Sequence, residues 1–378
     1  MMSKNTLVLM MGMIVIFPFE IAAQEPVIVD HQSIELNQIP MEWIDSAKAN
    51  LYIGYGHTSH GSQLTSGMNA VEAFYPDGTY DWSHSGGAGE LHLFEGAGYG
   101  SGYLELDCGY PGWDDQTRTY LDDHPACNVI IWSWCGQVNN VNLQEHYLQP
   151  MSQLEEEYPD VRFVYMTGHL EGLGPGGNLF EANQQIRDFC QQNDKILFDF
   201  ADIEKYSPDA DTNYQDYFAD DGCNYQLPGG GQANWAHNWL SNNPDHELSQ
   251  MSSLCGSCAH SVSLNCVKKG IACWHLWARL TGWNGQVNAI EEMPDEYDSL
   301  TIYPQPACDV VTIELNRNPV SGTLLLFDLH GKEIFRDKIN SNKYVLNLEK
   351  LNCEKGLYVL RLIGSDHVLS KKMLIVPH

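Results

Sequence analysis

Basic residues are scarce in this chain. Twenty Lys and Arg stand against 49 Asp and Glu, so the formal net charge at pH 7 is -29 over 378 residues. An excess of negative charge this large repels both phosphate backbones and anionic lipid head groups. We therefore expect neither nucleic acid nor an anionic membrane surface as a partner.

Long apolar runs are rare too, and the one that stands out lies at the N-terminus. Residues 1–23 have a lysine near the start, an apolar run and two alanines at the end, which is typical of a secretory signal peptide cleaved after Ala23. Pro18 and Glu20 interrupt the run, which is too short to span a membrane stably. No later segment reaches spanning length, so we expect a soluble mature protein without a transmembrane segment.

The chain has 11 cysteines, an odd number. In an exported protein cysteines are expected to form disulfides, with one left over here. Zinc binding is the alternative, because the spacing of four cysteines resembles that of zinc ligands: Cys255, Cys258, Cys266 and Cys273. An oxidising compartment favours bridges over zinc. Cys308 and Cys353 are a candidate pair in the C-terminal segment.

The segment from about Leu300 onward has a different sequence pattern from the rest of the chain. Short runs with alternating apolar residues, separated by turn residues, occupy 310–315, 323–328 and 356–362. This spacing predicts a small β-sandwich over residues 300–378, preceded by an acidic linker at 289–299.

Four motifs in this segment resemble the type IX secretion sorting domain of Bacteroidetes: residues 302–307, 326–332, 351–358 and 370–372. Gln305 and Cys308 stand where that family usually has Asn and Ser or Thr. The resemblance implies export by the type IX secretion machinery, with that machinery as a partner. It places the protein outside the cell or on the outer cell surface, and leaves open whether the domain is removed.

Residues 24–288 have enough chain for one domain. Apolar runs typical of buried parallel strands alternate with helical patterns. The expected strands are 51–55, 129–133, 162–167 and 195–200, and the expected helices are 114–122, 143–157, 178–192 and 267–280. This alternation predicts an α/β fold, a three-layer αβα domain with a mainly parallel sheet and right-handed crossovers.

The first of these strands ends in Gly56-His57-Thr58-Ser59-His60-Gly61 before a helix. A serine in this place lies at the carboxyl edge of the sheet, where open α/β folds keep their chemistry. Ser59 is therefore our candidate nucleophile, although hydroxyl side chains also cap helices. Polar groups follow the other strands as well, at 133–140, at 167–169 and at Asp199 and Asp202.

A late histidine, His260, precedes the last helix and is the candidate base. An early Ser and a late His are the layout of GDSL/SGNH hydrolases, which this domain resembles in its flavodoxin-like fold and in the motif at 57–61. The resemblance implies Ser59 as nucleophile and His260 as base, with Gly112 and Asn139 in the oxyanion hole. Ser257 stands where the family has its acid, and Asp245 is the proposed substitute. We also assign substrate-binding roles to His57 and His169.

The implied activity is that of an esterase, with a carbohydrate ester as one candidate substrate and no cofactor. Aromatic residues near the edge, Trp82, Tyr110, Trp113, Trp132 and Trp134, suit sugar rings but also suit a core. Two alternatives stay open. One is a metal-dependent hydrolase built on His57, His60 and His169, with His260 and Asp199 or Asp202 nearby. The other is a non-catalytic surface protein that binds glycans or mediates adhesion.

Overall fold

The protein is described here by a computed structural model. It describes residues 26–96, 102–285, 300–315, 322–328, 332–351, 353, 355–363 and 368–376. The expected signal peptide and acidic linker lie outside these residues. The chain divides into two compact units, Met1–Val287 and Asn288–His378. Among the described residues, no helix combines the length and the apolar character needed to cross a membrane.

The first unit is built on one seven-stranded sheet in the order β1-β7-β6-β5-β2-β4-β3, in which every neighbouring pair is parallel. The strands are β1 (Val27–Val29), β2 (Tyr52–Gly56), β3 (Trp82–Ser83), β4 (Leu91–Glu95), β5 (Val129–Trp132), β6 (Arg162–Met166) and β7 (Ile196–Phe198). The run Val129–Trp132 is buried throughout, as expected for a strand covered on both faces. The predicted mixed α/β fold with a parallel sheet is confirmed.

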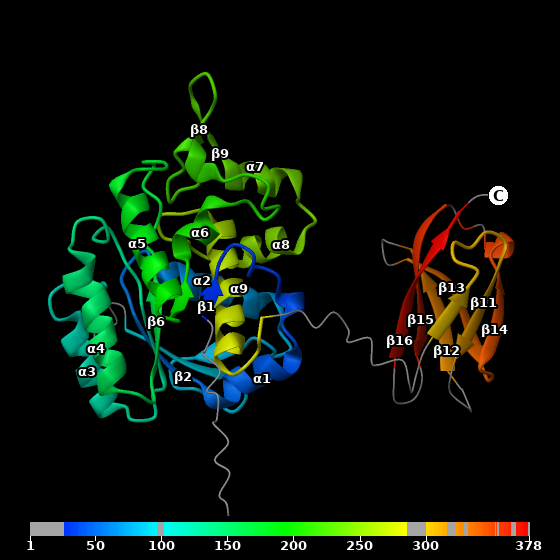
Figure 1. Cartoon of the computed structure of the whole chain (residues 1–378), viewed down its shortest axis with the longest axis horizontal. Coiled ribbons are helices and arrows are strands. Elements are labelled where there is room, and N and C mark those ends of the chain that lie inside the picture. Colours follow the sequence, from blue (N-terminus) through cyan, green and yellow to red (C-terminus); the bar gives the residue numbers. More distant parts are fainter. Residues whose placement is uncertain are drawn as a thin grey trace, which may run out of the picture. The chain divides into compact units, whose positions relative to one another are not determined.

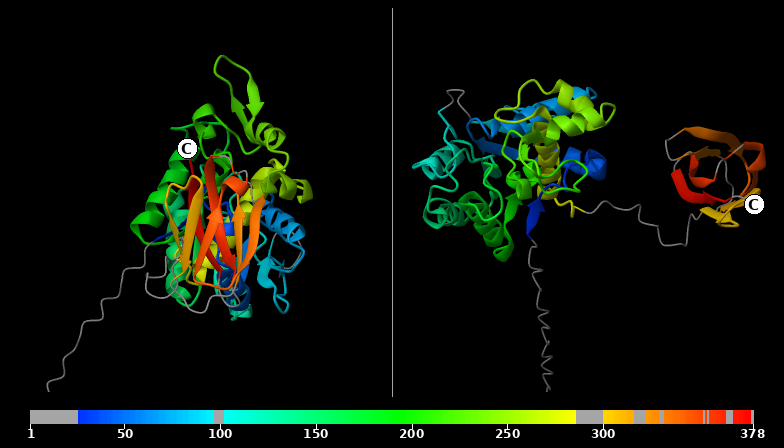
Figure 2. Two further views of the ribbon diagram at one scale, coloured as in Figure 1. Left: turned by 90° about the vertical axis from the view of Figure 1, so that its right-hand side faces the viewer. Right: turned by 90° about the horizontal axis from the view of Figure 1, so that it is seen from above.

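Helices cover both faces of this sheet (Figures 1 and 2). Right-handed crossovers explain why some helices lie on one face and some on the other, because the chain moves along the sheet in opposite directions in its early and late parts. One face is covered by α1 (Met41–Asn50), α2 (Ser62–Phe74) and α9 (Ser263–Leu280), and the other by α3 (Trp113–Asp123), α4 (Gln149–Glu157) and α5 (Asn178–Gln192). Shorter elements follow β7 in the sequence and precede α9: α6 (Phe200–Lys205), β8 (Asn224–Gln226), β9 (Gln232–Asn234), α7 (Trp235–Asn242) and α8 (Glu247–Leu254).

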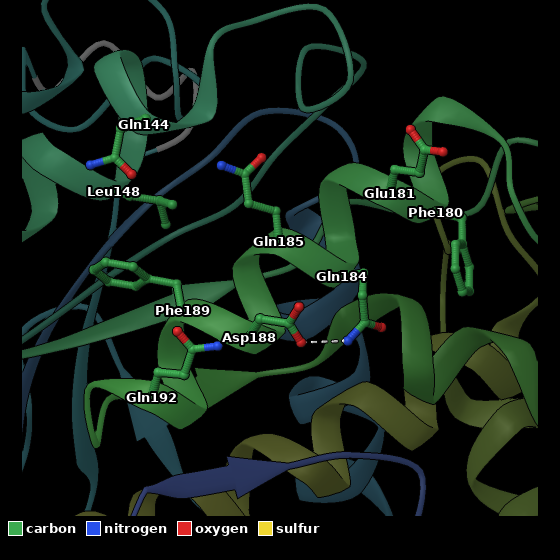
Figure 3. Close-up of a pocket in the computed structure, with 9 residues that line it drawn as sticks. All are labelled: Gln144, Leu148, Phe180, Glu181, Gln184, Gln185, Asp188, Phe189 and Gln192. Carbon is green, nitrogen blue, oxygen red and sulfur yellow. Dashed lines mark hydrogen bonds between the residues drawn. The ribbon is translucent and has the colours of Figure 1, made fainter.

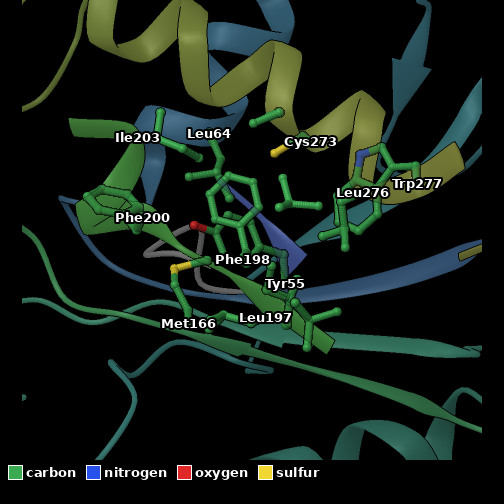
Figure 4. Packing of buried hydrophobic residues seen from close by; sticks show 14 of the residues in the cluster. Tyr55, Leu64, Met166, Leu197, Phe198, Phe200, Ile203, Cys273, Leu276 and Trp277 are labelled. Atoms are coloured by element: carbon green, nitrogen blue, oxygen red, sulfur yellow. The ribbon is translucent and has the colours of Figure 1, made fainter. Parts of the chain in front are cut away.

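The core between α9 and the sheet is densely aromatic (Figure 4). Leu276 and Trp277 of α9 lie over Tyr55 of β2 and Phe198 of β7, and all four side chains are at most 1% exposed. The tryptophans Trp113, Trp132 and Trp134 are also at most 2% exposed. These three side chains therefore belong to the core. Of the five aromatic residues considered for sugar binding, Tyr110 is well exposed.

Helices α2 and α9 touch backbone to backbone at two glycines. A Cβ on Gly67 would lie 1.8 Å from the carbonyl oxygen of Cys266, and one on Gly270 would lie 2.2 Å from the carbonyl carbon of Gly67. Only glycine permits this approach. The crossing matters for the site below, because α2 follows the loop 57–61 and α9 follows the loop that carries His260.

The second unit consists of two antiparallel sheets. One contains β10 (Leu300–Tyr303), β11 (Val310–Leu315) and β14 (Lys343–Asn347), and the other contains β12 (Gly322–Phe327), β13 (Glu333–Ile339), β15 (Gly356–Ile363) and β16 (Val368–Ile375). Residues of both sheets, including Ile313 and Leu360, share one apolar core. The proposed bridge between Cys308 and Cys353 is wrong, since both are free thiols.

Candidate functional site

The strand order puts a topological switch point between β2 and β5. From β2 the chain moves through α2 to β3 and β4 on one side, whereas from β5 it moves to β6 and β7 on the other. In open α/β folds, ligands bind at the carboxyl edge of the sheet where connections diverge in this way. Two loops meet there: the β2 loop (residues 57–61) and the β5 loop (residues 133–142).

Three side chains form a chain of contacts at this switch point. The Nδ1 atom of His60 lies 3.1 Å from Sγ of Cys135, and its Nε2 atom lies 3.0 Å from Oδ2 of Asp221. His60 is 6% exposed, while Cys135 and Asp221 are half-buried. We call these three residues the Cys135 triad. A thiol, an imidazole and a carboxylate in this order have the geometry of an activated nucleophile, its base and the group that orients the base.

The charges of the Cys135 triad support one another. Burial lowers the pKa of His60, but hydrogen bonds with Asp221 and Cys135 outweigh burial and raise the pKa to about 9. The hydrogen bond with His60 lowers the pKa of the Cys135 thiol, against an opposing effect of burial. Burial raises the pKa of Asp221, yet its contacts with His60 and His169 leave it below the ordinary value. The contacts thus favour the charged forms of these groups, which are the thiolate of Cys135, the imidazolium of His60 and the carboxylate of Asp221.

His60 lies in the middle of a stack of three imidazole rings. The ring centroids of His60 and His169 are 3.9 Å apart, and those of His60 and His260 are 4.1 Å apart. The planes deviate from parallel by only 5° and 8°. The stack fixes the plane of the His60 ring, so its two nitrogens stay directed at Cys135 and Asp221.

Close packing and one carboxylate hold the two loops together. A Cβ on Gly61 would lie 2.2 Å from Oγ of Ser133, so only glycine lets the β2 loop approach the end of β5. Asp107 accepts hydrogen bonds from the Thr58 hydroxyl at 2.5 Å and from the Gln137 amide at 3.1 Å. It thereby joins the β2 loop to the β5 loop.

A buried polar network supports the site from the side of α9. Lys269 pairs with Glu204 at 2.5 Å, with both side chains fully buried, and also donates to Gln63. Gln63 in turn donates to the carbonyl oxygen of Ala259 at 2.6 Å. This network connects the first turn of α2 to the residue before His260.

The loop that carries His260 is closed by a disulfide between Cys258 and Cys266. His260 is exposed and has a positive φ of 63°, a conformation that a non-glycine residue adopts rarely. The other nine cysteines are free thiols, so the expectation that most cysteines pair is wrong. Of the four cysteines with zinc-like spacing, two are in this bridge.

The structure brings only part of the predicted site together. The hydroxyl of Ser59 lies 3.7 Å from Sγ of Cys135, and His260 stacks on His60, so both flank the Cys135 triad. No hydrogen bond joins Ser59 to His260 in the described part of the chain. Asn139 donates to Glu171 at 3.0 Å. His169 contributes the third ring of the stack.

Three further predicted residues have other surroundings. Both ring nitrogens of His57 are engaged, one with Glu95 at 2.8 Å and one with the carbonyl oxygen of Thr58 at 2.7 Å. Gly112 precedes the first residue of α3 and has a φ of 91°. Asp245 is exposed ahead of α8, where its carbonyl oxygen accepts from Gln250.

Metal binding has a geometric basis at the same site. Single ligand atoms of His60, His169 and Asp221 lie within 4.8 Å of one another. His57, a member of the predicted cluster, is not in this group. Both ring nitrogens of His60 already contact Cys135 and Asp221, so an ion would have to displace one of these contacts.

Sequence reasoning missed Cys135 and Asp221. The signal for Cys135 was its place directly after an apolar strand, in Ser133-Trp134-Cys135, at the edge where the other polar groups were expected. Asp221 had no comparable signal. It reaches the site because its backbone N–H donates to the carbonyl oxygen of Leu170 at 3.1 Å, a pairing that local sequence does not reveal.

A separate surface pocket of about 440 Å³ lies beside α5 (Figure 3). It is lined by glutamines and by Phe180 and Phe189, and Gln184 donates to Asp188 within it at 2.7 Å. None of its lining residues belongs to the Cys135 triad.

Comparison with known proteins identifies the second unit. Residues 301–376 match the family model described as the secretion system C-terminal sorting domain. These residues form a type IX secretion sorting domain. The domain indicates interaction with the type IX machinery and export to the extracellular space or the outer cell surface. No curated protein matches the chain.

Solved structures resemble the chain only remotely. An engineered protein shares 9% identity at a TM-score of 0.21, covering 84% of this chain and 60% of that one. An FMN-binding beta-glucuronidase from Facaelibacterium prausnitzii L2-6 shares 7% identity at a TM-score of 0.20, and the match covers 85% of this chain and 47% of that one. An endo-beta-1,4-mannanase from Thermotoga petrophila shares 13% identity at a TM-score of 0.20, and the match covers 83% of this chain and 62% of that one. The chain thus spans less than two thirds of each of these structures. None of these findings supports the predicted resemblance to SGNH hydrolases.

Proposed function

We propose that the α/β unit of this exported protein is a hydrolase that attacks acyl carbonyl groups with the thiolate of Cys135. The observation that supports this most strongly is the contact chain from Cys135 through His60 to Asp221 at the switch point of the sheet. In this proposal His60 is the acid and base, and Asp221 orients and stabilises its imidazolium form.

The reaction proceeds in two halves. The thiolate sulfur bonds to the carbonyl carbon, and the C–O, C–N or C–S bond to the leaving group breaks as that group takes the proton of His60. Neutral His60 then removes a proton from water, whose oxygen attacks the thioester. The acid product leaves and the thiolate forms again, with His60 protonated. The hydroxyl of Ser59, 3.7 Å from Sγ, is close enough to donate to charge that develops at the reacting centre.

The nucleophile proposed from the sequence, Ser59 with His260 as its base, is the competing assignment. It would place the chemistry on the same edge of the sheet, and Asp245, Gly112 and Asn139 would then take the roles that the SGNH resemblance implies. The Cys135 triad is favoured because its base contacts the nucleophile and the carboxylate directly. An ester, a thioester or an amide would suit this chemistry, and a carbohydrate ester remains one candidate.

A panel of activated esters, thioesters and anilides tests the proposal with the full chain and two variants. We expect Cys135→Ala to lower kcat by at least about 1,000-fold, because it removes the nucleophile of a cooperating triad. Ser59→Ala should lower kcat by about tenfold to 100-fold, the effect of losing one polar donor near the transition state. Treatment with EDTA should leave the rate unchanged.

Other outcomes would contradict the proposal in distinguishable ways. Loss of activity in Ser59→Ala with retention in Cys135→Ala would support the serine assignment instead. Activity that EDTA removes would favour a metal site at His60, His169 and Asp221. A wild-type protein that binds glycans and hydrolyses no member of the panel would favour the non-catalytic alternative.

A further inference from the structure

Exposed hydrophobic side chains lie on the two segments that carry His169 and Asp221. In the described part of the α/β unit, the large hydrophobic side chains with high exposure are Met41, Tyr110, Leu173, Tyr217, Phe218, Leu227 and Leu254. Three of them, Leu173, Tyr217 and Phe218, are 40–46% exposed and lie within five residues of His169 or Asp221. Exposed apolar side chains concentrated beside a site often mark a binding surface.

Backbone pairing brings Leu173 and Phe218 to one place. The N–H of Asp221 donates to Leu170, and the N–H of Gly172 donates to Ala219, both at 3.1 Å. Leu173 and Phe218 are the next residues beyond this second bond. They leave the paired segments at the same end, each two residues beyond the bridge between Glu171 and Asp220.

Two features hold these side chains in place. Leu170 and Ala219 are buried in a small apolar cluster with Ala201, which anchors the paired segments from below. Phe218 has a φ of 59°, a strained conformation for an aromatic residue. A Cβ on Gly174 would lie 2.8 Å from the Phe218 ring, so the glycine allows the ring to pack against the neighbouring backbone. The protein thus keeps an aromatic ring at the surface in spite of backbone strain.

We propose that Leu173 and Phe218 form a subsite that binds a neutral, hydrophobic group of the substrate, on the Asp221 side of the Cys135 triad. This inference rests on the proposed function. The carboxylates of Glu171, Asp220 and Asp221 lie on the same paired segments, so a negatively charged group is disfavoured there. An aliphatic or aromatic group gains by covering Leu173 and Phe218.

Alkylation of Cys135 tests the subsite without knowledge of the substrate. The probes are iodoacetamide and N-(phenylalkyl)iodoacetamides with one to four methylenes, each of which forms a C–S bond as iodide leaves. Peptide mass spectrometry of the full chain gives the rate at each cysteine. We expect Cys135 to react faster than the half-buried Cys255, Cys308 and Cys353. At the best linker length, the phenyl probe should alkylate Cys135 on the order of tenfold faster than iodoacetamide does. Burial of about half of a phenyl group raises affinity by roughly this factor.

The double variant Leu173→Ser/Phe218→Asn should lose this gain, and Asn is chosen because it tolerates a positive φ. Met41→Ser, a matched change of an exposed apolar residue outside the two segments, should retain it. A phenyl gain that is absent, or equal in the double variant, would overturn the subsite while leaving the proposed function intact. A Cys135 that reacts no faster than the other half-buried cysteines would instead overturn the proposed function.

Discussion

The ion pair between Lys269 and Glu204 lies in the interior of the α/β unit, where neither side chain is exposed. Lys269→Met would leave the Glu204 carboxylate buried without its partner. We expect this variant to lose about 3–5 kcal/mol of unfolding free energy, the typical effect of breaking one side of a buried pair. Urea denaturation followed by circular dichroism measures the loss.

Lys195→Met provides the matched control. Lys195 also pairs with a carboxylate, Glu155, at 2.5 Å, but both side chains are 23% exposed. Its removal should cost about 1 kcal/mol or less, because an ion pair that water can reach contributes little to stability. Equal losses of unfolding free energy in the two variants would show that burial does not increase the effect of breaking the Lys269 pair.

At the scale of residues, three of the candidate residues from the sequence lie beside the Cys135 triad, and the roles predicted for them stay predictions. Ser59, His169 and His260 were expected at one edge of the sheet, and each lies next to a member of the Cys135 triad. Cys135 was overlooked because cysteines of an exported chain were expected to pair. The contacts of His60 join residues 75 and 161 positions apart, which no local pattern encodes.

The crossing of α2 and α9 makes a prediction at the scale of elements. Gly67→Ala places a methyl group against the backbone of α9, which cannot move aside as a side chain can. The helices must separate, and we expect a loss of about 1–3 kcal/mol, the range found for overpacked cores. Because α2 follows the β2 loop, alkylation of Cys135 should slow as well.

Gly256→Ala is the control for this change. A Cβ on Gly256 would meet no atom within 4 Å, and its φ is not positive. Its stability should stay within about 0.5 kcal/mol of the wild type. If Gly67→Ala were equally harmless in thermal unfolding, the close backbone contact would be refuted.

Elements that lie within longer apolar or periodic stretches were predictable, including the three-residue strand β7, whereas β1 and β3 were not. Helix α5 was expected at 178–192 and is found at Asn178–Gln192. Strands β1 and β3 have only three and two residues, too few for a recognisable period. Helix α9 begins at Ser263, four residues earlier than expected, in the turn that the bridge of Cys258 to Cys266 closes.

At the scale of the whole molecule, each unit has an apolar core of its own. Truncation before Leu300 should therefore leave the α/β unit folded, with a melting temperature within about 2 °C of its transition in the full chain. Export to the outer surface should fail, because the sorting domain is lost. Calorimetry and cell fractionation measure the two effects.

An unfolded truncated protein, or one that still reaches the surface, would contradict this division of roles. The sorting domain was the part best predicted from sequence, since its motifs are specific. Chemistry in the α/β unit was harder to predict, because a parallel sheet with helices on both faces supports many unrelated activities.

The central claim is that His60 and Asp221 activate Cys135. Its most direct test is the rate of iodoacetamide alkylation at Cys135 from pH 5 to 10, with Cys353 as the internal reference. Hydrogen bonding with His60 lowers the pKa of Cys135, against burial and Asp107, whereas burial raises the pKa of Cys353. We predict half-maximal reactivity of Cys135 clearly below pH ~8.5, the ordinary value for a thiol, and a rise toward that value in Asp221→Asn. A Cys135 that titrates at or above the ordinary value, unchanged by Asp221→Asn, would contradict the account.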